Sequence, residues 1–179
     1  MSLIKAFVFS LILFALLPGC SEDKSPKVLV EGSQITDQMA PKYEASLAEG
    51  IDFKKPGYPS FLAEVSGVSG KEDFGRWSDG AVARFRFKQL LPSKFAVLIT
   101  AGAFGPNLGK PVIIRVGKAE KEFVVKTAEP VEYSVNFEGI NGVDTIEVVS
   151  QKPTRPKDID PKNDDSRLLG VALVQLRIQ

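Results

Sequence analysis

Four side chains that could bind a ligand fall close together in a glycine-rich stretch at residues 67–80. They are Glu72, Arg76, Trp77 and Asp79, and Trp77 is the chain's single tryptophan. A tryptophan face beside carboxylate and guanidinium groups suits a sugar, because the ring stacks on apolar C–H patches while the charged groups bind hydroxyls. We therefore predict a ligand-binding site in this stretch.

Three further polar residues complete the predicted site. Asn107 lies in a Gly-Pro-Asn turn, and Asp165 and Arg167 directly precede the last apolar run of the chain. Loops at one end of a β-sandwich cluster together, so we expect residues 70–79 to contact residues 165–167.

Two ion pairs are expected among these charges. Arg76 and Asp165 have opposite charges and are expected to pair between the two loops. If residues 71–76 form one helical turn, Glu72 and Arg76 are neighbours at i,i+4 and can pair as well.

Two other interpretations of these residues stay open. Trp77 can instead plug the end of the core, with Arg76 and Asp165 tying the two loops together. Glu72 and Asp165 would suit a glycosidase as a carboxylate pair, but the sequence fixes neither their separation nor a raised pKa. We therefore predict no catalytic residues.

Composition narrows the chemistry further. The 179 residues include no histidine and one cysteine, and 23 basic against 22 acidic side chains give a net charge of +1. The commonest metal ligand and general base is therefore missing, and one cysteine cannot build a zinc or iron–sulfur site. A net charge near zero gives no general attraction to nucleic acid. We predict no metal, no cofactor and no nucleic-acid partner.

The first twenty residues predict a lipoprotein signal. Lys5 precedes an uncharged apolar run at residues 6–17, which is shorter than the about 20 residues that a membrane-spanning helix needs. The run ends in Leu-Pro-Gly-Cys, which resembles the bacterial lipobox, so Cys20 is predicted to carry acyl chains such as palmitate and to anchor the protein. The alternative is a soluble secreted protein with a chance cysteine at its cleavage site.

We expect three segments along the chain: a signal peptide at 1–19, a flexible tether at 20–49 and a β-sandwich domain at 50–179. The tether sequence is polar at its start and shows no sustained hydrophobic period. Ser21 is similar to the residue that favours outer-membrane sorting of enterobacterial lipoproteins. The expected location is therefore the bacterial cell envelope, on the periplasmic face of the outer membrane.

The domain sequence has the period-two pattern of strands separated by turns, and no helical pattern between them. About eight strands of this kind favour an all-β fold, an antiparallel jelly-roll-like sandwich. The runs are Phe61–Val65, Ala81–Lys88, Phe95–Ala103, Pro111–Val116, Glu122–Lys126, Val131–Phe137, Val143–Val149 and Leu169–Ile178.

Alternation within two of these runs makes finer predictions. Phe85 and Phe87 share a face that is predicted to be buried, while Arg84 and Arg86 point outward. Those arginines form either an ordinary solvated face or a patch for phosphate or lipid headgroups. In the last run, strict alternation is expected to place Leu173 and Leu176 on opposite faces.

Several motifs resemble a C-terminal module of bacterial phosphoglycerol transferases, envelope enzymes that decorate periplasmic glucans, and related modules of envelope glycosyltransferases. The resemblance implies an accessory β module, and the family's catalysis belongs to a separate sulfatase-like metal domain that has no counterpart here. We therefore expect no enzyme activity. The motifs are Gly-Ile-Asp-Phe at 50–53, Gly-Tyr-Pro at 57–59, residues 67–78, Ala-Phe-Gly-Pro-Asn at 103–107 and Asp-Ser-Arg-Leu-Leu-Gly at 165–170.

Two functional hypotheses remain. The first is a lipid-anchored envelope module that binds a periplasmic or cell-surface glycan, and the second is a scaffold for an envelope glycosyl- or phosphoglycerol-transferase. An open groove lined by Trp77, Arg76 and Asp165 would favour glycan binding. A buried Trp77 beside a broad exposed apolar patch would favour the scaffold.

Overall fold

The computed structural model describes residues 41–179. The predicted signal peptide, Cys20 and the tether as far as residue 40 lie outside this range. Within it, no helix is long and apolar enough to cross a membrane.

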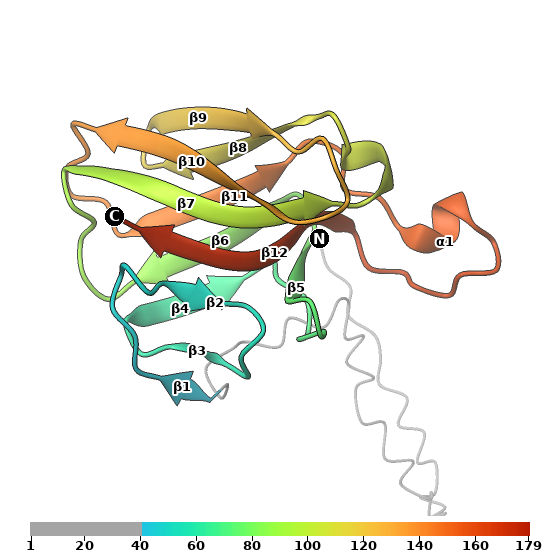
Figure 1. Ribbon diagram of the computed structural model, residues 1–179, viewed down its shortest axis with the longest axis horizontal. Coiled ribbons are helices and arrows are strands. Elements are labelled where there is room, and N and C mark those ends of the chain that lie inside the picture. The colour runs from blue at the N-terminus through green and yellow to red at the C-terminus, as the bar shows by residue number, and fades with distance from the viewer. Residues whose placement is uncertain (1–40) are drawn as a thin grey trace, which may run out of the picture. The chain divides into compact units, whose positions relative to one another are not determined.

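Two five-stranded sheets pack face to face (Figure 1). The sheet nearer the viewer, here the front sheet, has the order β10-β7-β12-β2, with β5 also paired to β12. Its strands are β10 (Val131–Glu138), β7 (Lys94–Ala103), β12 (Leu169–Ile178), β2 (Ile51–Asp52) and β5 (Arg76–Asp79).

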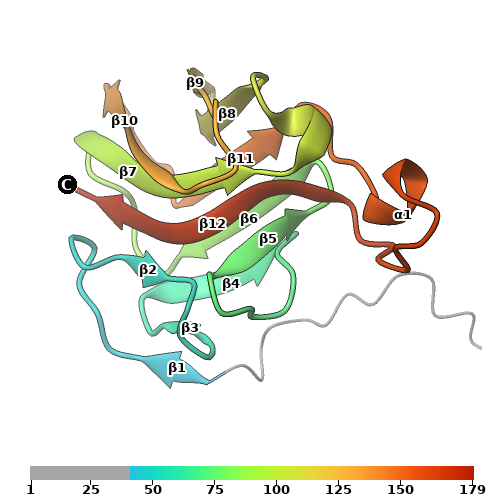
Figure 2. The same cartoon turned by 45° about the vertical axis from the view of Figure 1, so that its right-hand side comes forward.

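The second sheet, here the back sheet, has the order β4-β6-β11-β8-β9. Figure 2, turned by 45°, shows the two layers from another side. The strands of this sheet are β4 (Leu62–Ser66), β6 (Val82–Phe87), β11 (Thr145–Ser150), β8 (Pro111–Val116) and β9 (Ala119–Val124).

From β4 to β12 the chain changes sheet at nearly every step, and every pairing within the two sheets is antiparallel. The predicted all-β, jelly-roll-like sandwich is confirmed. Each of the eight predicted runs overlaps a strand, although β9 begins three residues before the predicted run Glu122–Lys126 and ends two residues before its end. Small elements complete the described chain: the parallel pair β1 (Lys42–Tyr43) and β3 (Tyr58–Pro59), the 3-10 turn Gly105–Asn107 and helix α1 (Pro156–Ile159).

The core lies between the sheets and is built from their inward side chains. Phe85 and Phe87 are 0% and 4% exposed, so the predicted alternation along β6 is confirmed. Phe85 meets Phe53 edge-on, with ring centroids 5.6 Å apart. Where the sheets approach at β9 and β10, Phe123 stacks on Tyr133 at 4.5 Å.

The strict alternation expected for β12 is wrong. The pairing of β12 with β7 shifts between Leu173 and Gln175, so β12 carries one extra residue there. Such a bulge reverses the side-chain parity of a strand. Leu173 and Leu176 therefore both face the core, at 0% and 1% exposure, and Gln175 faces outward beside Thr100.

The folded unit begins before Gly50, where the sequence places its start. Lys42 and Tyr43 pair with β3, and Leu47 packs against the core. The Leu47 carbonyl also accepts a hydrogen bond from the Ile178 amide at 3.0 Å. These contacts make residues 42–47 part of the domain rather than of a tether.

Candidate functional site

Three residues of the predicted site, Arg76, Trp77 and Asp79, lie on β5. The sequence pattern does not predict this strand. Trp77 pairs with Ala172 of β12, and Arg76 pairs with Leu173, which is fully buried. Because paired residues of an antiparallel ladder point to the same side, Arg76 faces the interior. Trp77 faces the outer side of the front sheet.

Trp77 lies between two phenylalanine rings on that outer side. Its ring meets Phe74 at 5.1 Å and Phe104 at 6.0 Å between centroids, both in edge-on geometry, which is a favourable arrangement for aromatic pairs. All three rings are partly exposed. The Trp77 backbone is held by Ser69, whose hydroxyl accepts from the Trp77 amide at 3.0 Å.

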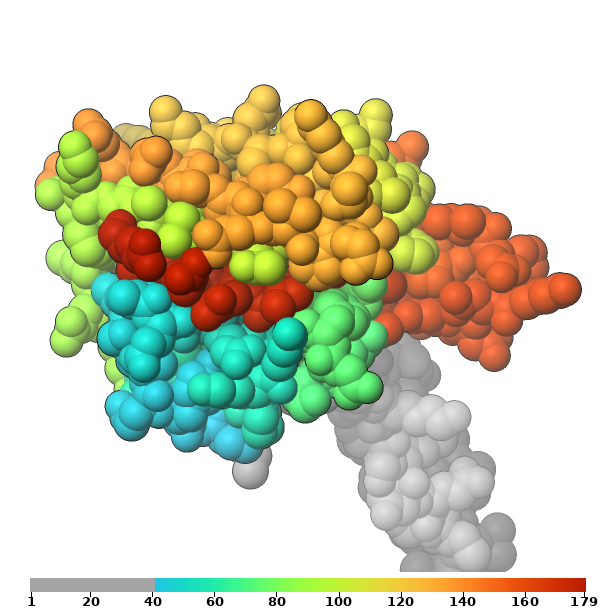
Figure 3. Space-filling model, in the orientation of Figure 1, coloured from blue at the N-terminus to red at the C-terminus, as the bar shows by residue number. Residues whose placement is uncertain are grey.

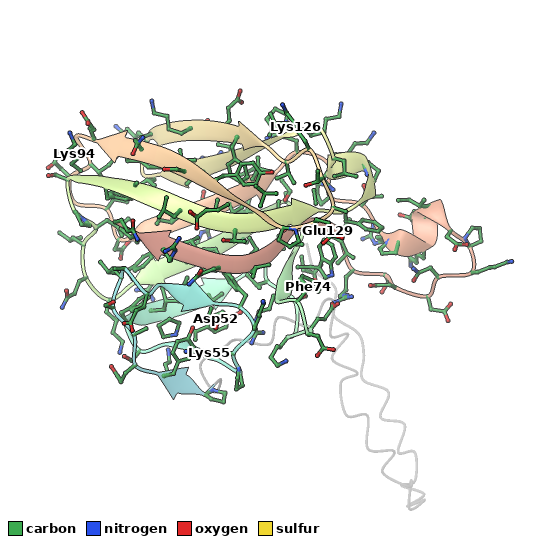
Figure 4. The ribbon with its side chains drawn as sticks, viewed as in Figure 1. Asp52, Lys55, Phe74, Lys94, Lys126 and Glu129 are labelled. Carbon is green, nitrogen blue, oxygen red and sulfur yellow. The ribbon has the colours of Figure 1, made fainter. Side chains whose placement is uncertain are left out.

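Phe74 and Phe104 are site residues that the sequence reasoning missed. Each lies inside a motif that the resemblance uses, and three aromatic residues near two predicted loops were the available signal. Figure 4 labels Phe74, which projects from the loop before β5.

A guanidinium joins two carboxylates next to these rings. Arg167 Nη1 donates to Glu72 Oε1 at 2.8 Å, and Arg167 Nη2 donates to Asp165 Oδ2 at 2.6 Å. The hydrogen bonds from Arg167 hold the pKa of Asp165 below its ordinary value, and the bond to Asp165 raises the pKa of Arg167. The expected contact between the two loops is present, with Glu72 and Arg167 as its ion pair.

The two ion pairs expected for Arg76 are wrong. Arg76 is 9% exposed, and no carboxylate of residues 41–179 lies within ion-pair distance of it. Its Nη1 donates to the Ser69 carbonyl at 3.2 Å, and its guanidinium lies 4.8 Å from the centre of the Tyr58 ring. The predicted helical turn before it is absent: Glu72 and Gly75 exchange backbone bonds in a tight loop.

Asn107 and Asp79 hold backbone groups. Asn107 is 2% exposed, and its amide donates to the Phe104 and Leu169 carbonyls while its oxygen accepts from the Lys152 amide. Asp79 Oδ1 accepts from the Leu168 amide at 3.0 Å. Both side chains fix loops around the rings, and the burial of Asn107 leaves no face of its amide for a ligand.

We call the resulting group the aromatic site. It consists of three aromatic rings and the charged network of Arg167. Among residues 41–179, no group of three or more acidic or cysteine residues is suited to bind a metal ion. Its members are Glu72, Phe74, Trp77, Phe104, Asp165 and Arg167.

The arginines of β6 lie on the opposite side of the sandwich and are neutralised. Arg84 Nε donates to Glu147 at 2.8 Å, and Arg86 Nη2 donates to Glu64 at 3.1 Å. Because each arginine already has a carboxylate partner, a phosphate or lipid-headgroup patch gains no support from this face.

The chain is similar to a described protein family and to several known proteins. A family model described as "Domain of unknown function (DUF7024)" matches residues 35–179. The chain is also 30% identical over 134 residues to phosphoglycerol transferase I of Escherichia coli O139:H28, Citrobacter koseri and Shigella boydii serotype 18. The alignment covers 73% of this chain but 17% of each relative, in the C-terminal region of those proteins. No solved structure matches.

Proposed function

The chain belongs to the DUF7024 family, and from this premise we propose that it is a non-catalytic, lipid-anchored module of the bacterial envelope that binds glycan through the aromatic site. The relationship to phosphoglycerol transferase I supports a role beside an envelope transferase. The aromatic site supplies the proposed binding chemistry.

The observation that carries the proposal is the state of Trp77. Its ring is fixed between Phe74 and Phe104 and is still partly exposed. A sugar ring needs such a rigid apolar face, and a face that is already ordered loses little conformational freedom on binding. Glu72, two residues before Phe74, uses only Oε1 for Arg167, which leaves Oε2 as an acceptor for a sugar hydroxyl.

The charged network supports binding rather than catalysis. A glycosidase needs one carboxyl group that keeps its proton near neutral pH, which requires a raised pKa. Asp165 has the opposite shift, because Arg167 holds its pKa low. Glu72, the second carboxylate, is committed to the same guanidinium.

Attachment through Cys20 remains part of the proposal. Cys20→Ser should prevent lipidation and leave the protein unprocessed or released, with the β-domain intact. Membrane fractionation after a high-salt wash measures this. Processed Cys20→Ser protein that stays in the membrane fraction would contradict the anchor.

Intrinsic fluorescence tests the binding directly, since Trp77 is the only tryptophan. Titration with β-linked glucan oligosaccharides, with and without phosphoglycerol substituents, should change the Trp77 emission with saturation. Arg167→Ala should weaken binding, while Arg84→Ala on the opposite sheet should leave it unchanged. Absence of any saturable change or calorimetric signal with both glucan types would overturn the proposal.

The scaffold is the second candidate, and one observation favours it. Leu108 and Ile159, which are 38% and 52% exposed, flank the turn after Phe104. The Ile159 Cδ1 atom lies 3.4 Å from the position that a Cβ atom on Gly105 would occupy. Together with the rings they offer an apolar surface to a protein partner. Co-purification with a transferase that is lost in Ile159→Asp but kept in Trp77→Ala would favour the scaffold.

A further inference from the structure

The outer face of the front sheet has an open part at some distance from the aromatic site. In Figure 3 the atoms of β12, in red, and parts of β7 show as a band between the orange β10 side and the cyan residues of the N-terminal part. The end nearest Trp77 is closed, because the Ala128 carbonyl packs over Gly102. The face is open from Thr100 onward.

The register of the sheet places outward side chains in rows across this surface. One row joins Gln175, Thr100 and Glu132, and the next joins Arg177, Leu98 and Ser134. A third row continues with Ala96 and Asn136. Asp52 extends the first row from β2, at the lower edge of the face in Figure 4. We call the uncharged members of these rows the platform: Ala96, Leu98, Thr100, Ser134, Asn136 and Gln175.

The polar groups of the platform are largely unused by the protein. The side chains of Thr100, Ser134 and Asn136 take part in no hydrogen bond with residues 41–179, and Ser134 and Asn136 are exposed. Gln175 uses only its amide nitrogen, which donates to the Glu49 carbonyl at 3.2 Å. Its side-chain oxygen accepts no hydrogen bond from these residues. Hydroxyl and amide groups of this kind both donate and accept, as sugar hydroxyls do.

Two apolar residues lie between these polar groups. Leu98 and Ala96 are partly exposed on β7, each flanked by buried neighbours that face the core. Arg177 of β12 and Glu132 of β10 form an ion pair across β7, and Asp52 on β2 is the remaining charged residue of the described rows. The platform therefore offers alternating apolar and uncharged polar contacts, which complement a neutral polyhydroxyl chain better than an anion or an acidic peptide.

The bulge in β12 creates this surface. Without it, Leu176 would share the outward parity of Ala172, and Gln175 would face the core. With it, Ala172 and Gln175 both face outward beside Gly102 and Thr100. Bulges re-aim side chains in this way next to functional surfaces.

We propose that the platform extends the aromatic site into a binding surface for a linear, neutral polysaccharide that lies along the strands. This inference rests on the proposed glycan binding at Trp77. The open part of β7 runs from Thr100 to Ala96, and a strand rises about 3.3 Å per residue, so the platform is roughly 13 Å long. A sugar chain that lies on the platform and also stacks at the rings passes over the Ala128 carbonyl at Gly102.

The test is calorimetric titration with neutral β-linked glucan oligosaccharides from disaccharide to octasaccharide. For the wild-type domain, affinity should increase with chain length. The double variant Ser134→Ala/Asn136→Ala should bind the disaccharide like the wild type and lose about fivefold to tenfold in affinity for the octasaccharide, as expected for two lost hydrogen bonds.

The matched control replaces an exposed pair on the back sheet, Glu64→Gln/Arg86→Gln, which keeps the net charge. It should bind every oligosaccharide like the wild type. Thermal unfolding of each variant verifies the fold, and both pairs are exposed, so small changes are expected.

The outcomes separate the two proposals. If affinity is independent of chain length, or if the Ser134/Asn136 variant binds the octasaccharide like the wild type, the platform is refuted. If Trp77→Ala nevertheless abolishes binding, the proposed function of the aromatic site is still supported. If no neutral oligosaccharide binds the wild-type domain, the platform fails, and a positive titration with phosphoglycerol-substituted glucan alone would still uphold the proposed function.

Discussion

The two outer faces of the sandwich rest on one core and differ in what their side chains do. On the back sheet, arginines and glutamates pair with each other across neighbouring strands, forming a charge ladder of Glu64, Arg86, Arg84, Glu147, Arg115 and Glu120. On the front sheet, the ion pairs Arg177–Glu132 and Lys94–Glu138 flank the platform, but the platform itself is uncharged, and most of its polar groups have no partner among residues 41–179.

The difference indicates which face is available for binding. Glu147 is the centre of the ladder and accepts from both Arg84 and Arg115 at 2.8 Å. Burial alone would raise the pKa of Glu147, but these two hydrogen bonds hold it below the ordinary value. A ligand on the back sheet must break existing pairs, whereas Thr100, Ser134 and Asn136 on the front sheet have side-chain polar groups without a partner among residues 41–179.

The largest expected effect tests the shared core. Phe85→Ala beneath the back sheet should lower the free energy of unfolding by about 3–5 kcal/mol, and Leu173→Ala beneath the front sheet by about 2–5 kcal/mol. Both residues are fully buried. Denaturant unfolding measures both, with Arg84→Ala as a surface control. A loss below about 1 kcal/mol for either core variant would mean that the sheets do not share one core.

The next effect separates the two faces. Glu147→Ala should cost about 1–2 kcal/mol, because two charge-assisted hydrogen bonds are lost from a side chain that is 13% exposed. Thr100→Ala on the platform should stay within about 0.5 kcal/mol, because its hydroxyl has no partner in the described chain. Equal costs in denaturant unfolding would erase the distinction between the faces.

The sequence predicts the sandwich because its long strands alternate clearly. Phe85 and Phe87 have charged neighbours on β6, so their burial follows from period two alone. β5 has no such signal: it is four residues, Arg-Trp-Ser-Asp, among glycines, with the arginine inside. Buried arginines are rare, and this one depends on the Tyr58 ring and the Ser69 carbonyl, which only the fold brings to it.

The charged network of the site was predictable in composition but not in pairing. Glu72, Asp165 and Arg167 were all identified, and the two loops do meet. The choice of Arg167 over Arg76 follows from strand parity on β5, which depends on its pairing with β12. The bulge in β12 leaves only a weak sequence signal: strict alternation would put the polar Gln175 on the same face as Val171 and Leu173.

A smaller effect tests the network by pH. Because Arg167 lowers the pKa of Asp165 in the folded state, the stabilisation is complete above the ordinary pKa of 3.8 and is lost as pH falls through the folded value. Asp165→Asn should therefore be less stable than the wild type by about 0.5–1 kcal/mol at pH 7, since the pair is partly exposed. The difference should shrink below pH 3.8. A difference that grows towards acid pH would contradict the pairing.

Glycan binding on the front sheet is tested most directly by an NMR titration of the 15N-labelled domain, residues 41–179, with a neutral β-linked glucan octasaccharide. We expect amide shift changes on β5, the outward residues of β12 and β7, and the Trp77 indole N–H, with the charge ladder of the back sheet unchanged. Shift changes centred on Arg84, Glu147 and Arg115, with none at Trp77, would contradict binding on the front sheet.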